Sequence, residues 1–180
     1  MVRALHSALD VARDDDAVRA VIIAGTGDAF SAGADLREFR DRPRRPLAQA
    51  LERRELGSLF LLLEAYRKPL VAAVNGEALG AGFGLVAACH LAVAATTARF
   101  GLPGVRLGIM PMTIMPAVFR TLPRKLGLEL MLTGRLMTAG EALGCGFVNA
   151  VVEGAGLGTA ARELAVAATG ANSLQGLTGL

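Results

Sequence analysis

Residues 70–95 read LVAAVNGEALGAGFGLVAACHLAVAA, and this stretch decides the fold class. Leu70–Val74 is a short apolar run that ends at the turn-forming pair Asn75-Gly76, which is typical of a buried strand followed by a tight turn. The residues from Gly82 to His90 are mostly small and apolar, as in a buried helix, and Leu91–Ala95 is a second apolar run. The order strand, glycine turn, helix, strand predicts an α/β protein.

No charged residue occurs from Ala78 to Ala98, and by length alone this stretch is compatible with a membrane span of about 20 residues. Three glycines and a histidine fall inside it, and Glu77 lies at its edge. We therefore favour a buried helix between two strands and expect no membrane span.

Hydrophobic periodicity predicts further elements on both sides of this stretch. Helices are expected at residues 1–13, Leu47–Ala65, Leu126–Leu132, Ala139–Leu143 and Thr159–Ala168, and strands at Val18–Ala24 and Phe147–Val152. The small residues from Phe30 to Leu36 predict a loop, and the charged segment after them is broken by prolines. We expect one core domain over residues 1–165 and a tail, 166–180, that begins a C-terminal helical region.

Length and composition narrow the class of protein. At 180 residues one domain is the default, because only about 30% of the unfolded surface stays exposed at that size. The net charge is +3, but no nucleic-acid-binding module is visible, so we expect no nucleic acid partner. Cys89 and Cys145 lie in apolar stretches without metal-ligand spacing, and the N-terminal segment has no signal-peptide pattern. A reduced, cytoplasmic compartment is therefore expected.

Two turns rich in small residues follow two of the predicted strands. They read SAGADL at residues 31–36 and NGEALGAG at residues 75–82. Side chains no larger than methyl let a ligand approach the backbone, and a helix N-terminus presents N–H groups that lack helical partners. Two such donors converging on one carbonyl oxygen would stabilise a thioester enolate. Either turn alone is a weak signal.

Six segments in series resemble the crotonase superfamily, the enoyl-CoA hydratase/isomerase family. They are VRAVIIAG (18–25), AFSAGADL (29–36), KPLVAAVNG (68–76), RLGIMP (106–111), LTGRLMTAGEA (132–142) and GFVN (146–149). The resemblance covers about residues 1–165 and implies a crotonase-like spiral of ββα units, the ClpP/crotonase fold, apparently truncated at both ends. It implies an acyl-CoA thioester as partner, coenzyme A only as part of that substrate, no metal or other cofactor, and a homotrimer or hexamer.

By motif position, the resemblance puts the two oxyanion donors at the backbone N–H groups of Ala34 and Ala81. The substrate-binding residues that it implies are Ala32, Asp35, Leu36, Arg37, Gly80, Gly82, Gly84, Gly104 and Met112. Arg37, and Arg40 with it, would lie near a phosphate of CoA. A solvated loop charge explains Arg37 equally well. Met112 would fill the acyl pocket.

The match breaks at the acid/base positions. Hydratases of the family resemble one another in two glutamates, and the corresponding positions here are Gly84 and Gly104. Hydration requires an activated water and a delivered proton, and glycine supplies neither. No Asp or Glu occurs between Glu77 and Glu129. Glu77 is therefore the one acid to test as catalytic, against a surface or helix-start role.

Other polar residues near the two turns have simpler interpretations. A short carboxylate such as Asp35 at a helix start usually caps the helix. His90 fits a core residue with a satisfied hydrogen bond better than a base, and Ser31 lacks the G-x-S-x-G setting of a nucleophile elbow.

Three functions are weighed from the sequence. The first is an enzyme of the enoyl-CoA hydratase/isomerase type, a lyase or isomerase with altered acid/base machinery. The second is a non-catalytic acyl-CoA-binding or scaffold protein of the same fold, which Gly84 and Gly104 favour. The third is a dinucleotide-binding unit, because residues 82–87 fit G-x-G-x-x-A. That fingerprint needs an acid about 20 residues further on, and none occurs before Glu129, so we set it aside.

Overall fold

The computed structural model describes residues 1–33 and 46–170, with side chains described from residue 54 onward in the helix that begins at Pro46. Its central part repeats one pattern: a first strand, a second strand, then helical structure. The two successive strands of each unit are β1 (Val21–Ala24) and β2 (Ala29–Ser31), β3 (Leu70–Val74) and β4 (Glu77–Leu79), and β5 (Leu91–Ala95) and β6 (Arg99–Gly101). The helical parts that follow are α3 (Pro46–Glu64), α4 (Ala81–Ala88), and a series made of the 3-10 turns η1 (Pro103–Leu107) and η2 (Met112–Ile114) with α5 (Met115–Thr121) and α6 (Arg124–Thr133). The α/β class and the ββα units are therefore confirmed.

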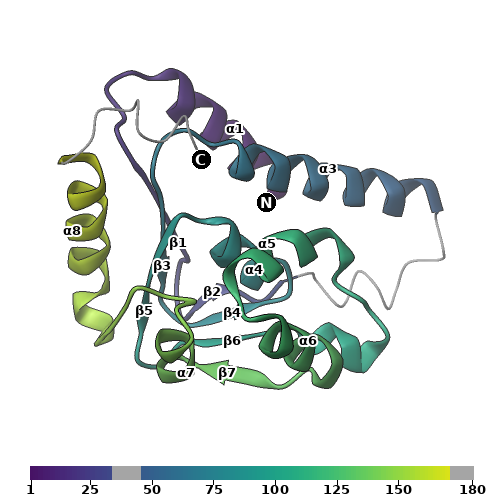
Figure 1. Ribbon diagram of the computed structural model, residues 1–180. Helices are drawn as coiled ribbons and strands as arrows, with labels where there is room; N and C mark the ends of the chain where they lie inside the picture. Colours follow the sequence, from purple (N-terminus) through teal and green to yellow (C-terminus); the bar gives the residue numbers. More distant parts are fainter. Residues whose placement is uncertain (34–45, 171–180) are drawn as a thin grey trace.

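The first strand of each unit joins one sheet, and the second strand joins another. The first sheet has the order β1-β3-β5-β8, with β8 at Ala150–Val152, and all its neighbours are parallel. The second sheet has the order β2-β4-β6-β7, with β7 at Leu136–Thr138, and only β6 and β7 are antiparallel. Because every unit crosses from the first sheet to the second, the chain winds as a spiral (Figure 1).

The first sheet is covered on both faces. Successive side chains of a strand point to opposite faces, so Val71 and Ala73 of β3 pack with α8 (Leu157–Gly170), while Leu70, Ala72 and Val74 join the main core. Figure 1 shows α8 alongside β1, β3 and β5. A parallel strand buried on both faces has an almost continuous apolar sequence, which explains the unbroken run LVAAV.

Helix α1 (Val2–Asp14) packs beside α3 and is held at its C-terminal end by two buried side chains. The Tyr66 hydroxyl donates to the Leu9 carbonyl at 2.7 Å. The Lys68 ammonium donates to the carbonyls of Ala12 at 2.8 Å and Asp15 at 2.6 Å, and only 6% of Lys68 is exposed. A buried cation therefore meets the negative end of the α1 dipole.

The sequence expectations for the first sheet agree closely with the structure. Strands β3 and β5 have the predicted bounds, whereas β1 begins at Val21 rather than Val18, and β8 covers only the end of the strand expected from Phe147 to Val152. The helix expected from Gly82 to His90 is α4, which ends at Ala88, so His90 lies in the turn after it. The expected domain boundary after residue 165 falls inside α8.

The second sheet and α5 were missed. Strands β2, β4, β6 and β7 are each three residues long, and all of them except β7 contain alanine, glycine or charged residues that strand propensity disfavours. Their pairing comes from neighbouring strands rather than from local preference. The uncharged stretch from Ala78 to Ala98 is divided among β4, α4 and β5. Within the described ranges, no helix combines the length and apolarity needed to cross a membrane.

Candidate functional site

The two glycine turns singled out in the sequence meet at one edge of the second sheet. Strands β2 and β4 are parallel neighbours, with Ser31 opposite Ala78, so their carboxyl ends lie together. A Cβ atom placed on Gly33 would lie 2.7 Å from the Leu79 carbonyl oxygen, and one placed on Gly80 would lie 3.7 Å from Cα of Gly33. Both glycines have positive φ, 87° and 54°. Glycine at position 33 is thus required by conformation and by space.

Helix α4 begins directly after this contact. Its first helical hydrogen bond runs from the Gly84 N–H to the Gly80 carbonyl at 3.1 Å. The N–H groups of Ala81, Gly82 and Phe83 precede that bond, so they belong to the unpaired first turn of a helix. The positive end of the helix dipole adds to their ability to bind a developing negative charge.

Ser31 lies between the two turns. Its hydroxyl oxygen accepts a hydrogen bond from the Gly33 N–H at 3.3 Å. A Cβ atom on Gly82 would lie 2.6 Å from the Ser31 Cβ, so the first turn of α4 packs directly on β2. Ser31 therefore has a packing role and no partner that would make it a nucleophile among the described side chains.

Several predicted site residues cannot be placed in this arrangement. Ala34, Asp35, Leu36, Arg37 and Arg40 lie outside the described residues. Ala32 is exposed, and Ala81 is half-buried at the start of α4. The structure therefore positions one of the two predicted donors directly and the neighbour of the other, Gly33.

The two glycines at the predicted acid/base positions have different surroundings. A Cβ atom on Gly84 would lie 2.6 Å from Ile114 Cγ2 and 2.9 Å from Phe60 Cζ, so the space beside Gly84 is filled. A Cβ atom on Gly104 would lie no closer than 3.5 Å to Ile109, which is ordinary van der Waals contact. Ile114 and Phe60 were not anticipated as neighbours of the site. Phe60 had only the apolar periodicity of its helix to mark it.

Glu77 and the predicted donor Ala81 lie at opposite ends of β4. Glu77 is the first residue of β4, is exposed, and pairs in register with Ala29 and Arg99, whereas Ala81 lies beyond the other end of that strand. Met112 is 64% exposed, on η2. Neither side chain is enclosed within the described part of the chain.

His90 and Cys89 both lie at the end of α4. The His90 Nδ1 accepts a hydrogen bond from the Leu70 N–H at 3.0 Å, so His90 is satisfied by the backbone of β3, and burial lowers its pKa from the ordinary value of 6.5. Burial raises the pKa of the Cys89 thiol to about 12, so this thiol is not reactive. Across residues 1–33 and 46–170, no cluster of three or more His, Cys, Asp or Glu side chains could hold a metal ion.

The chain has clear similarity to known proteins. A family profile described as enoyl-CoA hydratase/isomerase matches residues 1–176. A putative enoyl-CoA hydratase of Thermus thermophilus is 41% identical over 153 residues, covering 84% of this chain and 60% of that protein. A crotonyl-CoA hydratase of Syntrophomonas wolfei is 40% identical over 158 residues, covering 83% of this chain and 57% of that protein. The chain therefore spans less than two thirds of the length of these relatives.

Solved structures agree with the sequence comparisons. An enoyl-CoA hydratase of Mycobacterium smegmatis superposes with a TM-score of 0.86 at 36% identity, covering 94% of this chain and 65% of that one. An enoyl-CoA hydratase/isomerase family protein of Silicibacter pomeroyi superposes with a TM-score of 0.87 at 38% identity, covering 98% of this chain and 75% of that one. The expected crotonase fold is confirmed.

Proposed function

Because the chain belongs to the enoyl-CoA hydratase/isomerase family, we propose that it binds an acyl-CoA thioester and polarises the thioester carbonyl between the backbone N–H groups of Ala34 and Ala81. The observation that supports this most strongly is the close approach of Gly33 and Gly80, where a Cβ on Gly80 would be 3.7 Å from Cα of Gly33. Each proposed donor follows one of these glycines in the sequence. Both donors are therefore one residue from a shared contact.

Two donors at this point would act on negative charge as it develops. When a thioester carbonyl becomes an enolate, its oxygen gains charge, and backbone donors fixed in advance stabilise that charge by about 3 kcal/mol each. The N-terminus of α4 contributes its dipole to the same oxygen. The coenzyme A belongs to the substrate, and we propose no other cofactor.

Gly84 and Gly104 provide no side chain that could act as acid or base in the usual hydratase chemistry. We therefore favour a hydratase/isomerase-type protein in which ordinary enoyl-CoA hydration is absent or weak. A non-catalytic acyl-CoA-binding or scaffold protein is the second candidate. The filled space beside Gly84 favours it, because neither a water nor a carboxylate fits there.

We also infer, from the resemblance, a homotrimer or hexamer when the full-length C-terminus of the family is present, and, from the cysteine usage, a cytoplasmic location. Light scattering of a protein that includes that C-terminus tests the assembly, and a monomer at micromolar concentration would contradict it.

Turnover of crotonyl-CoA separates the two functions. Loss of the conjugated enoyl absorbance would identify an enzyme, whereas tight binding without turnover would identify a binding protein. If turnover occurs, we expect Glu77→Gln to leave its rate unchanged, because Glu77 is exposed at the far end of β4 from Ala81. Loss of turnover in that variant would instead make Glu77 the acid.

The donor pair is tested by Gly33→Ala. The new Cβ would collide with the Leu79 carbonyl, so the two turns must separate and the preference for butyryl-CoA over free CoA should fall about tenfold or more. Gly27→Ala is the matched control, since Gly27 also has positive φ, 75°, but no atom of the described residues lies within 4 Å of its Cβ position. Isothermal titration calorimetry measures both affinities. Equal preferences in the two variants would reject the proposed donor pair.

A further inference from the structure

Two side chains, Ile114 and Phe60, form a closed wall beside Gly84, one turn of α4 after the proposed donor Ala81. Ala81 and Gly84 lie three residues apart on α4, so they share a face of the helix and are separated by about 4.5 Å along its axis. Beside Gly84, the position of a Cβ atom is blocked by Ile114 Cγ2 at 2.6 Å and by Phe60 Cζ at 2.9 Å. A group that runs along this face from Ala81 therefore meets these two side chains.

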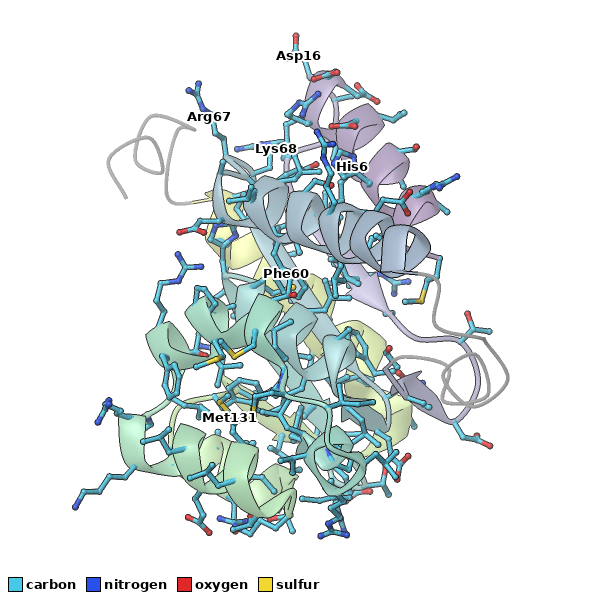
Figure 2. All side chains as sticks on the ribbon, turned by 90° about the vertical axis from the view of Figure 1, so that its right-hand side faces the viewer. His6, Asp16, Phe60, Arg67, Lys68 and Met131 are labelled. Carbon is cyan, nitrogen blue, oxygen red and sulfur yellow. The ribbon has the colours of Figure 1, made fainter. Side chains whose placement is uncertain are left out.

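The wall is part of the core rather than a loose surface feature. Ile114 is 2% exposed and Phe60 is 9% exposed. They come from different elements, η2 and α3, which pack against each other. Figure 2 shows Phe60 on the inner side of α3, near the middle of the molecule. Two well-packed side chains from separate elements do not move aside without cost.

The space beside two other glycines, Gly82 and Gly104, is bounded by other residues than the space beside Gly84. The flank of α4 at Gly82 is closed by Ser31, whose Cβ would be 2.6 Å from a Cβ on Gly82. Gly104, by contrast, has its nearest described neighbour, Ile109, at 3.5 Å or more. The closure at Gly84 is thus a local property of Ile114 and Phe60.

We propose that Ile114, together with Phe60, limits the length of the acyl group and makes this chain selective for short acyl-CoA thioesters. This inference rests on the proposed function, since it requires the thioester carbonyl to be held at Ala81. A short acyl group such as butyryl ends before the wall. A longer one such as octanoyl must displace buried atoms.

Calorimetric titration with CoA, butyryl-CoA and octanoyl-CoA tests the proposal. The unmodified chain should bind butyryl-CoA about tenfold or more tightly than octanoyl-CoA, and Ile114→Ala should remove or reverse this preference. Ile23→Ala is the matched control, because Ile23 is buried in β1 at 9% exposure and loses the same atoms. The Ile23→Ala variant should prefer butyryl-CoA over octanoyl-CoA to the same degree as the unmodified chain. Phe60→Leu, which removes the ring atom facing Gly84, replaces Ile114→Ala if that variant does not fold.

A double-mutant cycle tests the same contact without ligand. Gly84→Ala should lower the unfolding temperature of the unmodified chain, because its Cβ collides with Ile114. In the Ile114→Ala background the same change should raise the unfolding temperature, because the new methyl group fills the cavity. An equal loss in both backgrounds would overturn the proposed wall.

The titration separates this inference from the proposed function. Octanoyl-CoA bound as tightly as butyryl-CoA, with both tighter than CoA, would overturn the length limit and leave the acyl-CoA function standing. If neither ester bound more tightly than CoA, both would be rejected.

Discussion

His90 couples the stability of the central strand to pH. Its neutral ring accepts the Leu70 N–H at 3.0 Å, and burial lowers its pKa below the ordinary 6.5. Well above pH 6.5 the ring is neutral in both the folded and the unfolded chain, so it adds no pH dependence there. As the pH falls below 6.5, the unfolded chain binds the proton first, so the free energy of unfolding should decrease until the pH passes the lowered pKa of the folded chain. Urea denaturation between pH 7.5 and pH 5 measures this slope.

His90→Gln should flatten that slope. An unchanged slope in His90→Gln would show that other groups cause it.

At the scale of single residues, the sequence alone showed which positions lack an acidic side chain, but not which side chains occupy the space beside them. That positions 84 and 104, the predicted acid/base positions, are glycine can be identified without coordinates. The different space beside them depends on Ile114 and Phe60, which reach Gly84 only through tertiary packing. Glu77 was a candidate because it is near Ala81 in sequence. Its place at the far end of a strand required knowledge of β4.

The C-terminal end of α1 shows how one element depends on a buried charge. Lys68 donates to the carbonyls of Ala12 and Asp15 and is 6% exposed. Lys68→Met keeps the apolar stem but leaves both carbonyls without this donor, so the free energy of unfolding should fall by about 2 kcal/mol. Lys125→Met, on the exposed surface of α6, should change it by less than about 0.5 kcal/mol. Urea denaturation measures both, and equal effects would show that the Lys68 bonds are not stabilising.

Predictability at the scale of elements followed the length of each apolar run. Strands β3 and β5 have five apolar residues each, all of them buried except Leu91, so hydrophobicity alone marks them. Strands β2 and β4 have three residues each, and the small residues directly after them, Ala32-Gly33 and Gly80-Ala81-Gly82, indicate turns. Gly33 and Gly80, in these turns, approach each other closely. The small residues that form the candidate site are therefore also the reason why its short strands were not predicted from the sequence.

The whole molecule creates the site by repeating one crossing between its sheets. In the first unit the crossing runs from β1 to β2, and in the second from β3 to β4. The two crossings pack on each other, since Asn75 Nδ2 donates to the Gly27 carbonyl at 2.7 Å. These units show no sequence repeat, because they follow the same path from one sheet to the other but have different side chains. The spiral was predictable only through family resemblance.

Gly76 is the tightest point between these crossings. A Cβ atom there would lie 1.9 Å from the Asp28 carbonyl oxygen, so Gly76→Ala must separate the turns that join the two sheets. We expect the free energy of unfolding to fall by about 2 kcal/mol or more, and acyl-CoA affinity to fall with it. Gly57→Ala, in α3 with no atom of the described part of the chain within 4 Å of its Cβ position, should instead raise the free energy of unfolding by up to about 1 kcal/mol. Thermal and urea unfolding measure the pair. A Gly76→Ala variant as stable as the unmodified chain would mean that the crossings tolerate separation, and the packing of the two units would then not be what fixes the site.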